Sequence, residues 1–102
     1  DVQVSGHVQN IGWQNYSSGF AGTTGKGLWL EAVRLKLTGQ VAEKYDIWYR
    51  VHSSDYGWLG WAKNGDEAGT EGLGKAVEAV QIVLEDKGSS APGSTSSSFI
   101  KK

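Results

Sequence analysis

Two pairs of aromatic side chains are the residues of this sequence best suited to hold a ligand. Trp13 and Tyr16 lie three residues apart, and so do Trp58 and Trp61. A sugar ring has an apolar C–H face and a rim of hydroxyl groups, so it is bound by an aromatic platform with planar polar groups beside it. Such polar residues flank both pairs: Asn10, Gln14 and Asn15 the first, and Asp55, Lys63 and Asn64 the second. The sequence therefore contains the materials for two carbohydrate subsites.

The same tryptophans could instead fill a hydrophobic core, because a Trp in a small domain usually anchors packing. Trp13 and Trp58 follow a glycine in two similar segments. We expect these two side chains to be core residues. Trp61 and Tyr16 are less regular in pattern, so we expect them to be more exposed and to be the better place to look for a ligand.

Two histidines and two glutamates also recur. His7 and His52 could contact a ligand in a pH-dependent way or bond a turn carbonyl, and no third ligand of metal-site spacing accompanies them. Glu31 and Glu78 form a carboxylate pair of the kind that glycoside hydrolysis uses. Repeat symmetry predicts equivalent environments for the two, whereas an acid and a base need different pKa values. We expect each glutamate to accept backbone N–H groups from a Gly-rich loop, with a bond to a sugar hydroxyl as the alternative.

Composition excludes several classes of protein. The 102 residues carry 10 Lys and Arg against 11 Asp and Glu, a balance that argues against binding to nucleic acid or to an anionic membrane. The absence of Cys excludes disulfides and thiolate metal sites. No apolar run approaches the length of a membrane span, and the first residues do not resemble a signal peptide. We expect a mature module taken from a larger protein, without cofactor or metal.

An internal repeat organises the chain. Its matching segments are Gly12-Trp13 with Gly57-Trp58, Ala21–Gly25 with Ala68–Gly72, and Glu31–Val33 with Glu78–Val80. The offset is 45 residues before the Gly-rich loop and 47 after it. The register defines a first repeat over residues 1–45 and a second over 46–87. Residues 88–102 form a Gly/Ser-rich tail, which composition predicts to be a flexible linker.

The repeats have the pattern of β-strands. Apolar and polar residues alternate over 2–5, 33–37, 47–52 and 80–84. The alternation slips by one residue near Glu31-Ala32 and near Glu78-Ala79, which predicts a β-bulge at each place. A helix over Lys75–Leu84 is the alternative interpretation, because its apolar residues also fit a helical stripe.

Neither repeat is large enough to close a core alone. We therefore expect an all-β fold in which two quasi-equivalent antiparallel units share a core, as a prism or a sandwich. The apolar faces expected to meet are Val33, Leu35 and Leu37 in the first repeat and Val80, Ile82 and Leu84 in the second.

The combined motifs resemble a known family. His7–Trp13, then Ala-Gly-Thr-x-Gly, then Glu-Ala-Val-x-Leu-x-Leu is similar to the clostridial hydrophobic repeat with a signature tryptophan, over residues 1–87. The second repeat departs from the family's pattern at Ser53 and Ser54, where Val and Gln are usual, and Tyr16 stands where a Trp is common. These departures put equal ligand binding by the two repeats in question.

The resemblance implies a non-catalytic module of secreted or cell-surface proteins of Gram-positive bacteria, one that binds polysaccharide or cell-surface components. We therefore expect a module that attaches its parent protein to a glycan or a cell-wall polymer. Adhesion to a surface protein is the alternative, and neither nucleic acid nor membrane is an expected partner. The candidate ligand-binding residues are Trp13, Tyr16, Asn10, Gln14, Trp58, Trp61, Asp55, Asn64, Glu31 and Glu78.

Overall fold

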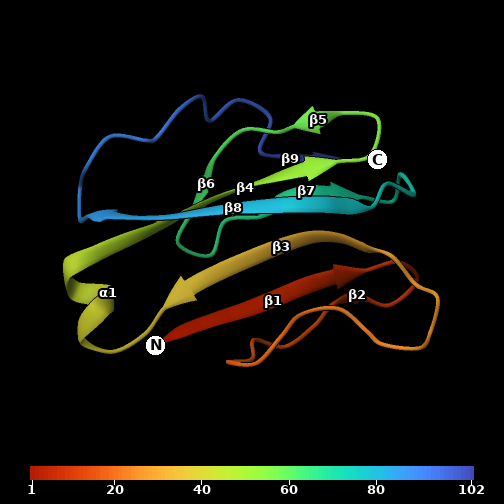
Figure 1. Cartoon of the computed structure of the whole chain (residues 1–102), viewed down its shortest axis with the longest axis horizontal. Coiled ribbons are helices and arrows are strands. Elements are labelled where there is room, and N and C mark those ends of the chain that lie inside the picture. The colour runs from red at the N-terminus through yellow and green to blue at the C-terminus, as the bar shows by residue number, and fades with distance from the viewer.

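The computed structural model describes residues 1–102 and confirms an all-β fold, with nine strands and one short helix (Figure 1). In chain order the elements are β1 (Val2–Val8), β2 (Gly12–Trp13), β3 (Leu30–Leu37), α1 (Gln40–Lys44), β4 (Tyr45–Ser53), β5 (Gly57–Trp58), β6 (Ala62–Lys63), β7 (Ala68–Glu71), β8 (Val77–Asp86) and β9 (Phe99–Lys101). The single helix has five residues, far fewer than a bilayer crossing requires.

The strands form two sheets that reproduce the repeat. One sheet has the order β2-β1-β3-β7-β9, and in the other β4 pairs with β5, β6 and β8. Each repeat contributes a long antiparallel pair, β1 with β3 and β4 with β8, and a two-residue strand on the outer edge of that pair. The register is also equivalent, since His7 lies opposite Trp13 and His52 lies opposite Trp58.

Both predicted bulges are present. His7 pairs with Ala32 and Val8 with Leu30, so Glu31 is the extra residue in β3. The register of β4 and β8 shifts in the same way, between His52 and Ser53, and leaves Glu78 unpaired. The strand interpretation of residues 75–84 is confirmed over the helical one, because β8 spans Val77–Asp86.

The shared core lies between the two sheets. Val33 and Leu35 of β3 pack against Ile47, Tyr49 and Val51 of β4, which are almost completely buried. Ala62 and Ala68 complete this cluster. The core therefore depends on side chains from both repeats.

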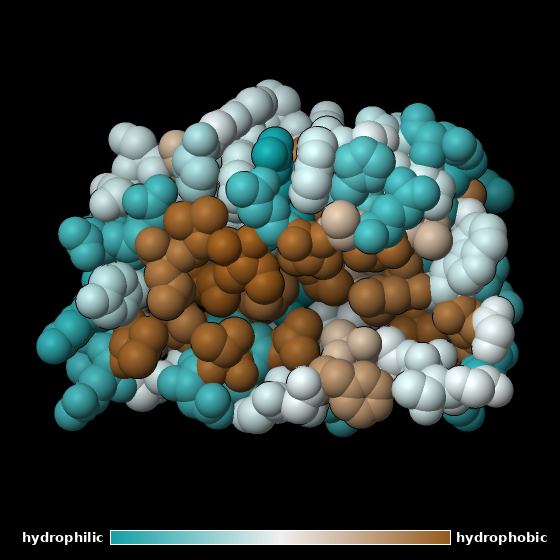
Figure 2. Space-filling view, viewed as in Figure 1, coloured by the Kyte–Doolittle hydropathy of each residue, from teal (hydrophilic) through white to brown (hydrophobic).

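The prediction that Val80, Ile82 and Leu84 pack into the shared core is wrong. Val80, Ile82 and Leu84 of β8 are 38%, 51% and 51% exposed. In the region where the two sheets overlap, β3 packs mainly on β4 and pairs with β7. Strand β8 lies outside this region, so its apolar side chains are left uncovered. Figure 2 shows apolar side chains gathered in a band across the middle of this face of the molecule.

The Gly/Ser-rich tail lies along the second repeat. Trp61 N–H donates to the Ser94 carbonyl at 2.9 Å, and Gly69 N–H donates to the Ser98 carbonyl at 2.9 Å. The tail ends in β9, which pairs in parallel with β7. These contacts bring residues 92–99 beside the aromatic side chains of the repeats, which composition alone does not indicate.

Candidate functional site

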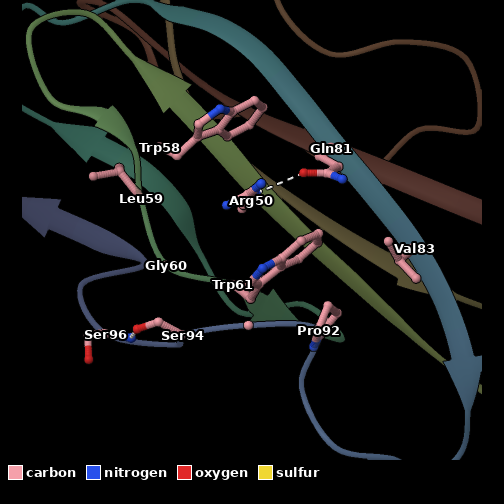
Figure 3. A pocket seen from close by; sticks show the side chains of 11 residues that line it. Arg50, Trp58, Leu59, Gly60, Trp61, Gln81, Val83, Pro92, Ser94 and Ser96 are labelled. Atoms are coloured by element: carbon pink, nitrogen blue, oxygen red, sulfur yellow. Dashed lines mark hydrogen bonds between the residues drawn. The ribbon is translucent and has the colours of Figure 1, made fainter.

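The second aromatic pair lines an open cleft of about 440 Å³ (Figure 3). Strands β4, β5 and β8 and the tail each supply part of its wall. The lining side chains that carry chemistry are Arg50, Trp58, Trp61 and Gln81, with Ser94 and Ser96 from the tail.

A tight turn positions Trp58. Asp55 and Gly57 both have a left-handed backbone, with φ of 66° and 74°, which reverses the chain between β4 and β5. The turn places Trp58 opposite His52, and the two rings meet edge to face with centroids 5.2 Å apart. The indole of Trp58 therefore has a fixed orientation although it is 44% exposed.

Arg50 lies between the two tryptophans. It precedes His52 by two residues on β4, so its side chain is on the same face of the sheet. Its guanidinium carbon is 4.5 Å from the Trp58 ring centroid and 5.0 Å from that of Trp61. This geometry is that of a cation–π contact with both rings.

The charge of Arg50 has no counter-ion in the protein. Its Nε donates to Gln81 Oε1 at 2.8 Å, which holds the guanidinium in place, and its two terminal nitrogens form no hydrogen bond. Every ion pair of the structure uses a lysine or a histidine. The cleft thus combines an exposed indole with planar N–H donors that can serve a hydroxyl, carboxylate or phosphate oxygen.

The first repeat contains a similar arrangement with Arg34. The Arg34 guanidinium lies 4.6 Å from the Trp13 ring and 5.0 Å from the Tyr16 ring, and Arg34 Nε donates to Ser5 Oγ at 3.1 Å. Arg34 is on the last long strand of its repeat, whereas Arg50 is on the first. The sequence analysis missed both arginines, because Arg34 and Arg50 do not occupy matching positions when the two repeats are aligned. The strand register was the signal that could have found them.

The surroundings of the two aromatic pairs differ. None of the three clefts of the structure is lined by Trp13 or Tyr16. Phe99 of β9 lies beside Trp13, with ring centroids 6.3 Å apart, and the Lys36 ammonium lies 4.2 Å from the Tyr16 ring. An open aromatic cleft is therefore found in the second repeat alone.

The expectations that Trp13 and Trp58 are core residues and that Trp61 is exposed are wrong, and Tyr16 is half-buried. Trp58 is the exposed one of its pair, whereas Trp61 is only 6% exposed, and Trp13 is half-buried rather than a core residue. The tail causes the burial of Trp61, since a Cβ added to Gly93 would lie 2.9 Å from the indole nitrogen.

The flanking polar residues lie away from this cleft. The Gln14 amide bonds both the N–H and the carbonyl of Gly22, at 2.8 and 3.0 Å. Asn10, like Asp55, occupies a left-handed turn position, with φ of 67°. The structure gives these residues local contacts, and none of them lines the cleft that holds Trp58.

Asn64 is an exposed residue that bonds the buried Asp46 at the start of β4. It accepts a hydrogen bond from Ile47 N–H at 3.0 Å and donates to Asp46 at 2.9 Å. Gly88 N–H donates to the other Asp46 oxygen, also at 2.9 Å. These donors, first the Gly88 N–H and then the Asn64 amide, hold the pKa of the Asp46 carboxyl below its usual value.

Each bulge glutamate bonds the histidine of its own repeat. His7 Nδ1 lies 3.0 Å from Glu31 Oε1, and His52 Nδ1 lies 2.9 Å from Glu78 Oε1. The expected partners, backbone N–H groups for glutamate and a turn carbonyl for histidine, are wrong. The bulge aims each carboxylate at the histidine on the neighbouring strand.

The environments of the two glutamates are not equivalent. Glu31 is 3% exposed, whereas Glu78 is exposed. Glu71 of β7 lies 3.6 Å from His7 Nε2, so the second repeat covers the pair in the first. A groove of about 370 Å³ beside this pair is lined by His7, Glu31 and Glu71 together with the Asn10 turn. No group of three or more His, Asp or Glu side chains is placed to hold a metal ion.

The sequence was compared with known proteins. A search of curated proteins and a search of solved structures gave no match. The family model described as clostridial hydrophobic W matches residues 7–39 and 52–86, which include both His–Trp pairs and both bulge glutamates. These segments cover more than half of the chain, so the protein belongs to the clostridial hydrophobic W (ChW) family and carries two tandem copies of its repeat.

Proposed function

We propose that this chain is a non-catalytic binding module that attaches a larger secreted or cell-surface protein to carbohydrate or to a cell-wall polymer. The observation that carries the proposal is the cleft of the second repeat, where the exposed Trp58 ring lies beside an arginine without a counter-ion. An indole face binds the C–H face of a sugar, and a fixed guanidinium supplies hydrogen bonds to the sugar's oxygens.

The cleft is suited to part of a polymer. It is open to solvent and has one exposed ring, so we expect it to hold a few sugar units with low affinity. Tandem modules or clustered proteins would raise the avidity through effective concentration. The unpaired positive charge of Arg50 favours units that carry a carboxylate or phosphate group.

Retention of the whole chain on purified Gram-positive cell walls and on insoluble polysaccharides tests the proposal. Trp58→Ala is expected to abolish retention. Trp29→Ala is the matched control, since Trp29 is 49% exposed and does not line the cleft. Near-ultraviolet circular dichroism establishes that both variants are folded.

Two outcomes would overturn the proposal. Undiminished retention of folded Trp58→Ala would exclude the cleft as the binding site. Retention on no glycan, together with Trp58-dependent capture of a defined cell-surface protein, would make adhesion to protein the function of the same cleft.

A further inference from the structure

Strands β3 and β8 are equivalent in the repeat but differ in how they are covered. Val33 and Leu35 of β3 are 4% and 5% exposed, whereas their counterparts Val80 and Ile82 of β8 are 38% and 51% exposed. Val33 and Val80 are identical, Leu35 and Ile82 are both branched aliphatic residues, and the positions in each pair differ by 47 residues. The difference is therefore one of partner: β3 is covered by the second repeat, and no segment covers β8 in the same way.

Part of the cover on β3 is an edge contact with β7. Ala68 pairs with Val33 and Gly69 with Ala32. The backbones approach so closely that a Cβ on Gly69 would overlap the Glu31 carbonyl oxygen and the Ala32 Cα. Gly69 also has a φ of 126°, a region that disfavours other residues. This contact thus requires glycine.

The first repeat contains the same segment, and there it makes no such contact. Its residues are Ala21, Gly22 and Thr23, and Gly22 has a similar φ of 105°. The segment belongs to no strand, and a Cβ on Gly22 would meet only Leu30 Cδ1, at 3.9 Å. Gly22 therefore has the backbone conformation of Gly69 without a strand against it.

The receiving edge is also unused. Ala79 and Val80 of β8 correspond to Ala32 and Val33, and β8 pairs with β4 alone. Within one chain the Ala21–Thr23 segment does not reach the free edge of β8. The Gln14 amide holds Gly22 to the first repeat, and the segment between β2 and β3 lies on the outer edge of β1 (Figure 1).

We infer that a second copy of this chain docks on β8, with its Ala21–Thr23 segment paired beside Ala79 and Val80. The contact repeats between chains the one that β7 makes with β3 within the chain. It covers the Val80, Ile82 and Leu84 side chains, which form part of the exposed apolar surface. Because the two surfaces that meet are different, the association is heterologous.

The mass of the whole chain as a function of concentration, measured by sedimentation, tests this inference. The wild-type chain is expected to associate reversibly. Ile82→Lys, at a side chain 51% exposed, is expected to raise the dissociation constant at least about tenfold. Ile11→Lys, at an apolar residue 54% exposed in the β1–β2 turn, is the matched control and is expected to leave association unchanged.

A mixing experiment tests the identity of the two surfaces. Gly22→Ala is expected to block association as Ile82→Lys does, because its Cβ would meet the backbone of β8. Each variant keeps the surface that the other lacks, so an equimolar mixture is expected to form a heterodimer of twice the chain mass.

Three results would overturn the inference. The first is a wild-type chain that stays monomeric up to millimolar concentration. The second is association that folded Ile82→Lys leaves unchanged. The third is association that Gly22→Ala leaves intact, which would indicate pairing of β8 with β8 instead. None of these results bears on glycan binding at the Trp58 cleft, so the two proposals fail separately.

Discussion

Arg34 and Arg50 occupy the same place in the two repeats although they stand on opposite strands of the repeat hairpin. Each guanidinium carbon lies 4.5–4.6 Å from the ring of the signature tryptophan. The cross-strand pairs are Ser5 with Arg34 and Arg50 with Gln81, and in each pair the partner accepts a hydrogen bond from the arginine Nε. An arginine beside the signature tryptophan is thus part of both repeats, while the open cleft belongs to one.

Arg50→Gln is expected to weaken binding to acidic cell-wall fragments by at least about tenfold, because a charge-assisted hydrogen bond is lost. Arg34→Gln is the matched variant and is expected to change the affinity little, since neither Arg34 nor Trp13 lines a cleft. Titration calorimetry with soluble fragments measures both. Equal losses in the two variants would show that the repeats bind alike.

Gly69→Ala is expected to lower the free energy of unfolding by about 3 kcal/mol or more, through backbone overlap with β3 and an unfavourable φ. Gly22→Ala shares the φ penalty, but in the monomer its Cβ would make only an ordinary van der Waals contact with Leu30 Cδ1, so a loss of about 1 kcal/mol is expected. Urea unfolding at low protein concentration compares them. A similar loss for both would mean that the contact of β7 with β3 contributes little.

Glu31→Ala is expected to destabilise the fold by about 1–3 kcal/mol, because it leaves Nδ1 of the buried His7 ring without its hydrogen-bond partner. Glu78→Ala removes the equivalent pair at an exposed site and is expected to cost less than about 1 kcal/mol. Thermal unfolding distinguishes the two. A larger effect at Glu78 would contradict the role assigned to burial.

Asp46 is expected to make the free energy of unfolding depend on pH in the acidic range. Its pKa is lower in the folded chain than in the unfolded one, so its charged form adds stability that is fully present above the unfolded value of about 3.9. That contribution is lost as the pH falls through the lower, folded pKa. Asp46→Asn is expected to be less stable than wild type at pH 7 and to lose less stability on acidification, as urea unfolding between pH 7 and pH 2 measures. Parallel pH profiles for the two chains would be the contrary result.

The strands, the repeat and both bulges follow from local pattern. The bulge at Glu31 was predictable because one extra residue in a strand displaces the alternation of every apolar residue after it. The shared core was predictable from size, since neither repeat could bury its own apolar residues. These features depend on residues close together in the sequence, or on the number of apolar residues that each repeat has to bury.

The candidate site was only partly predictable. Trp58 and Trp61 were named from their spacing, but which of them faces solvent is decided by Gly93 and Ser94, more than thirty residues away. The contact of Arg50 with Trp58 arises from strand register rather than from spacing along the chain. The open face of β8 depends on how far one sheet overlaps the other, which no local pattern encodes.

The dependence of Val33 and Leu35 on the second repeat has a consequence for biosynthesis. The fully buried core residues that they meet outside β3 all come later in the chain, and the last of these is Ala68, which follows Leu35 by 33 residues. At about 5–20 residues per second, translation leaves these side chains uncovered for roughly 2–7 seconds. The first repeat therefore cannot complete its core as it leaves the ribosome, and its apolar face is open to chaperones until the second repeat has been made.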